Sequence, residues 1–178
     1  MGAPAAHLFS RVDAYEHRLC LRLNRTCQWA PVRHFFAIVS RLGDGVFWYA
    51  TAVLLPIAYG ASGAVAAARM AVTGVIGVAL YKYLKTRLVR ERPYIALFGI
   101  VPGTPALDRY SFPSGHTLHA VSFSILIVSD FPELATLIIP FTCLVAASRV
   151  ILGLHYPTDV AAGALLGSFL AILAIVLV

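Results

Sequence analysis

Long uncharged segments restrict this sequence to one kind of structure. Residues 45–68, 134–148 and 160–178 contain no Asp, Glu, Lys or Arg. Hydrophobic residues make up 60% of the chain, charged residues 12%, and the mean hydropathy is +0.81. A soluble domain rarely has so apolar a composition, and a backbone inside a bilayer must satisfy its own hydrogen bonds. We therefore predict an all-α integral membrane helix bundle.

Glycines and polar turns divide the chain into about five transmembrane helices. Gly60, Ser62 and Gly63 separate the first two spans, and Ser129 to Pro132 separate the third from the fourth. The predicted spans are Gly45 to about Tyr59, Val65 to Leu84, His116 to residue 128, Leu134–Ser148 and Pro157 to the C-terminus. This layout predicts two parts, an N-terminal segment (1–44) and a transmembrane domain (45–178).

The N-terminal segment is predicted to be an amphipathic helix that lies in the membrane interface. Its apolar residues recur every three or four positions, while arginines occupy the other faces. The apolar set is Leu8, Val12, Tyr15, Leu19 and Leu23, and the arginines are Arg11, Arg18, Arg22 and Arg25. We expect Trp29 and Pro31 to end this helix, and 35–39 to form a short second piece. Asp44, within Leu-Gly-Asp-Gly, is interpreted as a turn residue.

The net charge of +6 favours anionic lipid headgroups as contacts rather than nucleic acid. In the predicted layout every Lys and Arg except Arg69 lies on one face, together with the N-terminal segment, the loop after Leu84 and residues 148–159. The positive-inside rule favours a cytosolic position for that face of an inner-membrane protein, and an extracytoplasmic position stays open. The three cysteines form no C-x-x-C pair, so neither a disulfide framework nor a metal site is predicted. The oligomeric state is left open.

Three polar blocks fall on that same face. They are Lys85 with Arg92 and Pro93, then Pro113 to His116, then Ser148 and Arg149 with His155 and Asp159. Each cation taken alone is readily explained as an interfacial anchor, and each histidine as a structural residue. Those separate explanations leave the shared location of the blocks unexplained.

The chemistry of these blocks suits a compact anion such as phosphate. Lys85, Arg92 and Arg149 supply three fixed cations. Ser114 and Gly115 come directly before an apolar helix, whose N-terminal N–H groups can hold an oxyanion. Asp159 follows His155 by four positions, a spacing that puts both side chains on one helical face, where the carboxylate can accept a hydrogen bond from the imidazole N–H and orient the ring. His155 is then a candidate nucleophile and His116 a candidate acid, while His119 is a candidate packing or substrate-contact residue.

The blocks resemble the signature of the type 2 phosphatidic acid phosphatase superfamily, K-x6-R-P, P-S-G-H and S-R-x5-H-x3-D. All eleven specified positions match in order. The resemblance implies that Lys85, Arg92 and Arg149 bind phosphate with help from Ser114 and Gly115, and that His116 protonates the leaving group. It further implies a phosphohistidine at His155 supported by Asp159, without a metal or other cofactor. The vanadate-dependent haloperoxidases have a similar site, but the predicted spans argue against them.

The implied activity is hydrolysis of a lipid phosphate or pyrophosphate, of the phosphatidate, phosphatidylglycerol phosphate or polyprenyl class. Two alternatives remain at this stage. A phosphohistidine resolved by another alcohol would make the protein a lipid phosphotransferase. A non-enzymatic protein that binds lipid phosphates is the other, and the complete set of two histidines and an aspartate argues against it.

The spacing of Arg149 and His155 requires a break between two helices. Six residues separate Arg149 from His155, so on a continuous helix the two side chains would point away from each other. We therefore predict that Gly153 ends one helix before Pro157 begins the next.

Overall fold

The chain is almost entirely helical. The computed structural model describes residues 3–106 and 108–177, with side chains from Ala14 onward. Its helices are α1 (Ala3–Arg25), α2 (Ala30–Arg41), α3 (Phe47–Arg87), α4 (Pro93–Ala96), α5 (Gly115–Asp130), α6 (Ala135–Ile151) and α7 (Pro157–Leu177). A π-helical turn, η2 (Leu42–Val46), joins α2 to α3, and the 3-10 turns η1 (Thr26–Gln28) and η3 (Pro132–Leu134) precede α2 and α6. The predicted all-α class is confirmed.

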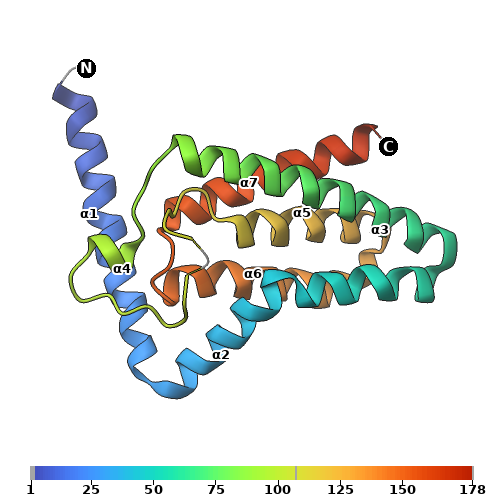
Figure 1. Cartoon of the computed structure of the whole chain (residues 1–178), viewed down its shortest axis with the longest axis horizontal. Coiled ribbons are helices and arrows are strands. Elements are labelled where there is room, and N and C mark those ends of the chain that lie inside the picture. The colour runs from blue at the N-terminus through green and yellow to red at the C-terminus, as the bar shows by residue number, and fades with distance from the viewer. Residues whose placement is uncertain (1–2, 107, 178) are drawn as a thin grey trace.

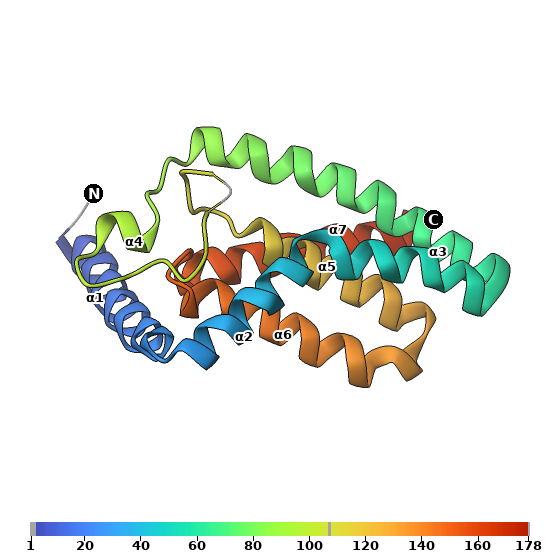
Figure 2. The same cartoon turned by 60° about the horizontal axis from the view of Figure 1, so that its bottom comes forward.

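The long helices form a bundle with α1 across one end. In both views α3, α5, α6 and α7 run along the long axis, and α1 and α4 lie at the end where the N-terminus is found (Figures 1 and 2). The C-terminus lies at the other end (Figure 1). All loops that carry the predicted site residues therefore meet at the α1 end of the bundle.

Helix α3 is a hairpin of two arms, 47–59 and 61–87. Gly60 has φ 59° and ψ −130°, which is not helical, and the chain reverses there. A Cβ on Gly63 would lie 2.0 Å from the carbonyl oxygen of Leu55, so the arms touch backbone to backbone beside the turn. The predicted break between the first two spans is confirmed at Gly60.

Within residues 3–106 and 108–177, three helical stretches are long and apolar enough to cross a membrane: Ala30–Arg87, Pro132–Ile151 and Pro157–Leu177. The first contains both arms of α3. Helix α5 has 16 residues, about 24 Å of helix, which is short for a hydrocarbon core of about 30 Å. The bundle class agrees with the sequence, and the number of crossings stays a prediction.

Helix α5 occupies the middle of the bundle and is packed most closely against α7. A Cβ on Gly163 would lie 2.5 Å from the Ser114 oxygen, and one on Gly167 would lie 2.4 Å from the Leu118 oxygen. These two glycines, one turn apart, let the backbones of α5 and α7 approach each other. The close contact fixes the N-terminus of α5 beside the start of α7.

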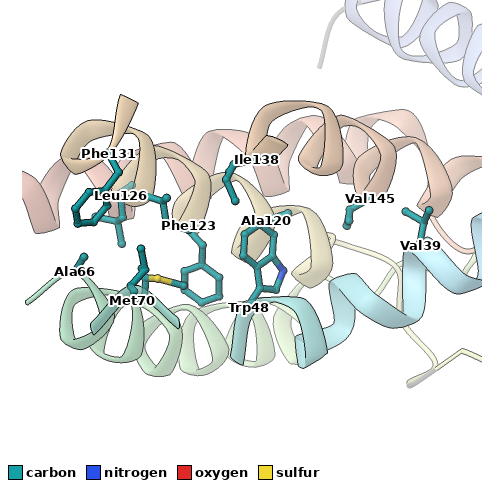
Figure 3. Packing of buried hydrophobic residues seen from close by; sticks show 13 residues of the cluster. Val39, Trp48, Ala66, Met70, Ala120, Phe123, Leu126, Phe131, Ile138 and Val145 are labelled. Atoms are coloured by element: carbon teal, nitrogen blue, oxygen red, sulfur yellow. The ribbon is translucent and has the colours of Figure 1, made fainter. Parts of the chain in front are cut away.

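The apolar core lies between α3, α5 and α6. Trp48 and Met70 from the two arms of α3 surround Phe123 of α5, while Ile138 and Val145 approach from α6 (Figure 3). Large apolar side chains also cover the outer surface, among them Val53, Leu54, Ile57, Val72, Leu165, Phe169 and Ile172. An apolar surface of this extent is unfavourable in water and suits contact with lipid.

Helix α1 forms as predicted but buries a different face. Tyr15, expected on the apolar side, is 67% exposed, whereas Glu16 and Asn24 are 3% and 5% exposed. Burial of these polar residues is tolerated because both are hydrogen-bonded to the far end of the chain. The parts of the prediction that concern Leu8, Val12 and Arg11 fall outside the described side chains.

The segment after α1 differs from its prediction. Pro31 lies in the first turn of α2 instead of ending the preceding helix, a position that tolerates its missing N–H. Helix α2 spans the expected 35–39 piece and continues through η2 into α3 without a loop. Asp44 lies beside a kink in this junction, because Gly45 has φ 141° and ψ −41°, which are not helical, so its interpretation as a turn residue agrees with the structure. The proposed division at residue 44 falls inside this turn, and the two-part organisation stays a prediction.

Candidate active site

A cavity of about 730 Å³ opens at the α1 end of the bundle. Seven of the residues singled out in the sequence line it: Lys85, Arg92, Gly115, His116, His119, Arg149 and His155. Ser114 and Asp159 lie behind this lining. The end of α3, the start of α5 and the end of α6 thus bring the three sequence blocks together.

The predicted interruption between α6 and α7 is confirmed. Helix α6 ends at Ile151, Gly153 has φ 72°, and α7 begins at Pro157. Positive φ favours glycine here, and the N–H groups of Leu154 and His155 both donate to the carbonyl oxygen of Arg149. This turn directs the Arg149 and His155 side chains into the same cavity.

His155 and Asp159 meet across the turn rather than along one helix. Nδ1 of His155 lies 3.6 Å from Oδ2 of Asp159, which is longer than a hydrogen bond. Oδ2 instead accepts from the N–H of Tyr156 at 2.8 Å, a capping interaction at the start of α7. Nδ1 of His155 is buried without a hydrogen-bond partner among the described residues, and support of the ring by Asp159 stays a prediction.

The contacts of His155 identify which ring nitrogen is available. Arg92 approaches Nε2 at 3.2 Å, and a guanidinium can only donate. Nε2 is therefore the acceptor, and the proton of the neutral ring is on Nδ1, facing Asp159. Burial, followed by the charges of Arg149, Arg92 and Lys85, holds the pKa of His155 well below 6.5. At neutral pH the ring is uncharged, with a lone pair directed toward the cations.

Asp159 is anchored by a buried network that the sequence did not indicate. Nη1 of Arg90 lies 2.7 Å from Oδ1 of Asp159, and Nη2 lies 2.7 Å from Oε2 of Glu16 in α1. The guanidinium also stacks on Tyr156, 3.9 Å from the ring centroid. Glu16 in turn accepts from the N–H and hydroxyl of Thr158. Arg90 lies outside the three sequence blocks and connects α1 to the start of α7.

Two of the three cations share one carboxylate. Asp108, in the loop before α5, is 2.7 Å from both Nζ of Lys85 and Nη2 of Arg92. Burial raises the pKa of Asp108, but hydrogen bonds from Lys85 and Arg92 outweigh burial and hold this pKa below 3.8. Arg149 is 3% exposed and donates to the hydroxyl of Ser40 in α2. The cations are thus fixed in place by neighbours from several elements.

The start of α5 leaves two backbone donors facing the cavity end. Ser114 caps the helix, because its hydroxyl accepts from the N–H of Thr117. Its own N–H donates to the carbonyl oxygen of Asp159 at 3.0 Å, so this group is not available to a ligand. The N–H groups of Gly115 and His116 have no partner within the helix. A Cβ on Gly115 would lie 3.3 Å from the Tyr81 ring, so a larger residue here would crowd the space between the start of α5 and Tyr81.

His119 lies between α5 and the second arm of α3. Its Nδ1 is 2.9 Å from the Gly115 oxygen, and its Nε2 is 3.2 Å from the Gly74 oxygen. Both nitrogens therefore contact backbone, as a packing residue would, although the ring lines the cavity. Its contact with a substrate stays a prediction.

The rest of the cavity is apolar and opens sideways. Small residues of the α3 arms line it, including Ala52, Ala67, Ala71, Gly74 and Ala79. Two further lining residues, Tyr49 and Val75, are 75% and 71% exposed, one on each arm. The cavity therefore joins a cationic end to an apolar groove at the lipid-facing side of the bundle.

A model of the PAP2 superfamily matches residues 63–178, which contain all three sequence blocks. The chain belongs to this superfamily. The resemblance noted from the motifs is thus confirmed at the level of the family.

Two crystal structures have a fold similar to the one described here. LpxE of Aquifex aeolicus superposes with a TM-score of 0.76 at 23% identity, over 89% of this chain and 93% of that one. A transmembrane PAP2-type phosphatidylglycerolphosphate phosphatase of Bacillus subtilis gives 0.73 at 22% identity, over 94% and 86%.

Several PAP2 relatives carry the names of phosphatases. A decaprenylphosphoryl-5-phosphoribose phosphatase of Mycolicibacterium smegmatis is 38% identical over 82 residues, which are 45% of this chain and 42% of the relative. An undecaprenyl-diphosphatase of Sulfolobus acidocaldarius is 31% identical over 60% of this chain and 52% of its own length. A lipid A 1-phosphatase of Rhizobium johnstonii is 27% identical over 81% and 67%. The chain thus spans about half the length of the first two relatives.

Glu16→Gln tests the buried network. The amide can still accept from Thr158 but loses its charge opposite Arg90, so we expect the free energy of unfolding to fall by about 1.5–3 kcal/mol. Thermal unfolding in detergent measures this change. Glu91→Gln is the matched control, because Glu91 and Arg109 are 46% and 69% exposed and such pairs contribute about 0–1 kcal/mol. Equal effects from the two substitutions would contradict the role given to Glu16.

Asp108→Asn tests whether Asp108 competes with an anion for Lys85 and Arg92. Removing the charge frees both donors, so we expect inorganic phosphate to bind roughly tenfold more tightly, a gain of about 1.4 kcal/mol. Isothermal titration of the purified protein in detergent measures the affinity. Glu91→Gln, which alters an exposed carboxylate in the segment between α3 and α4, should leave it unchanged. Weaker phosphate binding by Asp108→Asn would show that the carboxylate organises the cations instead of competing for them.

Proposed function

We propose that this protein is a membrane-embedded lipid phosphatase that hydrolyses a lipid phosphate monoester or pyrophosphate through a phosphohistidine at His155. The observation that carries the proposal is the single cavity in which a cluster of cations and histidines continues into an apolar groove. A water-soluble phosphate ester would have no use for the groove, and a lipid without phosphate would leave the cations unsatisfied. The names of the relatives support the same class of substrate.

The substrate would bind with its phosphate among Lys85, Arg92 and Arg149, beside the N–H of Gly115. These groups neutralise the charge that spreads over the phosphoryl oxygens in the transition state. Fixed cations that already face one another need little rearrangement when the phosphate arrives. Arg92 also contacts Nε2 of His155, so this hydrogen bond must transfer to a phosphoryl oxygen before the Nε2 lone pair can react.

In the first chemical step, the lone pair on Nε2 of His155 attacks phosphorus. The bond from phosphorus to the leaving oxygen breaks, and His116 gives that oxygen a proton. Asp159 offsets the positive charge that develops on the His155 ring. In the second step, His116 takes a proton from a water molecule, and the oxygen of that water attacks phosphorus. The bond between phosphorus and Nε2 of His155 then breaks, and inorganic phosphate is released. No metal ion takes part in this sequence.

His155→Ala tests the chemistry. We expect phosphate release from lipid phosphates in detergent micelles to fall to background, because the nucleophile is lost. The measurement covers phosphatidate, phosphatidylglycerol phosphate and undecaprenyl mono- and diphosphate, with EDTA present. His34→Ala, an exposed histidine of α2, is the matched control and should keep wild-type rates. Near wild-type release by His155→Ala would refute the mechanism. Transfer of the phosphoryl group to an added alcohol in place of water would identify a phosphotransferase.

Ala71→Phe tests the groove. Ala71 lines the apolar part of the cavity, so a ring at this position should obstruct a lipid tail without reaching the cations. We expect kcat/KM to fall at least about tenfold for long-chain substrates and to stay within about twofold for a short-chain phosphate monoester, since only the former needs the groove. Equal losses for both substrates would argue that the tail binds elsewhere.

A further inference from the structure

The carboxylate that faces His116 comes from an unexpected part of the chain. Asp44 lies in η2, the π-helical turn between α2 and α3, far from all three sequence blocks. Oδ1 of Asp44 is 3.2 Å from Nε2 of His116. The side chain of His116 is 10% exposed, and both residues line the cavity.

The backbone on either side of Asp44 explains how it reaches this position. A Cβ on Gly43 would lie 2.6 Å from Cγ2 of Val145, so this residue must be small for η2 to pack on α6. Gly45 has φ 141°, and a Cβ there would lie 2.7 Å from the Tyr49 ring. Two glycines with distinct steric requirements thus hold the turn and direct the side chain between them toward α5.

The cations that line the cavity explain why His116 would need a carboxylate beside it. A histidine that donates a proton to a leaving group must first be an imidazolium, yet Lys85, Arg92 and Arg149 line the same cavity and disfavour a further positive charge. Asp108 is bound to two of those cations, and Asp159 is bound to Arg90. Among the described residues, Asp44 is the carboxylate within ion-pair distance of His116.

We propose that Asp44 is a positioning residue that orients His116 and stabilises its imidazolium, so that His116 can protonate the leaving oxygen. As the bond from phosphorus to oxygen breaks, the proton on Nδ1 of His116, the ring nitrogen that does not contact Asp44, passes to that oxygen, and His116 becomes neutral with its remaining proton on Nε2. Asp44 keeps its charge and its contact with the ring throughout. This inference rests on the proposed phosphatase function, and it assigns each histidine its own carboxylate, Asp159 for His155 and Asp44 for His116.

The basicity of the leaving group tests the assignment. 4-Nitrophenolate leaves readily without a proton, whereas an alkoxide needs one. We expect Asp44→Asn to lower kcat roughly tenfold to a hundredfold for an alkyl phosphate such as phosphatidate, and to change kcat for 4-nitrophenyl phosphate by no more than about twofold. Asp44→Glu should recover part of the loss. Asp130→Asn, at the opposite end of the bundle beside Arg69, is the control and should affect neither substrate.

Equal losses for the two substrates, or no loss for either, would overturn the inference. A second measurement uses His116→Ala: if Asp44 acts through His116, adding Asp44→Asn to that variant should cause no further loss of alkyl phosphate hydrolysis. A further loss would overturn the inference as well. Failure of the proposed function is distinguishable, because in that case the wild-type protein itself would release no phosphate.

Discussion

The arrangement of this bundle depends on keeping three cations together in a largely apolar environment. Lys85, Arg92 and Arg149 are each less than a tenth exposed, and like charges brought so close repel one another. The fold compensates with carboxylates and carbonyl oxygens drawn from separate elements, including Asp108 from the loop before α5 and Leu154 from the turn between α6 and α7. Under the proposed function, the mutual repulsion of these cations is what would make the site attract a multiply charged anion. Stability and phosphate binding would then be two aspects of one electrostatic problem.

Local and pairwise features of the site could be predicted from the sequence. The distance along the chain from Arg149 to His155 required a helix break, and Gly153 with Pro157 supplied the residues that produce one. The uncharged runs likewise predicted the long helices, because segments of such apolar composition are stable inside a membrane. Predictions of this kind succeed when the physical cause lies within a few residues.

Contacts between distant segments could not be predicted in this way. Glu16 and Arg90 are 74 residues apart in the sequence. The local sequence around Glu16 therefore does not indicate which cation it pairs with. The apolar spacing of α1 pointed to Tyr15, but hydrogen bonding to Thr158 determined the buried face. Asp44 was interpreted as a turn residue because flanking glycines usually mean a turn. The chain does bend there, at Gly45, but nothing in the local sequence indicates that Gly43 packs on α6.

The sideways opening between the arms of α3 has a consequence for how such a protein would encounter its substrate. A lipid that enters from the surrounding bilayer never leaves the membrane, so the relevant concentration is its mole fraction in one leaflet. Turnover would then follow surface dilution, and adding inert lipid would slow it even at a fixed bulk concentration. The two products would separate by phase, with the dephosphorylated lipid returning laterally and the phosphate departing into water. That partition would draw the reaction forward and make it hard to reverse.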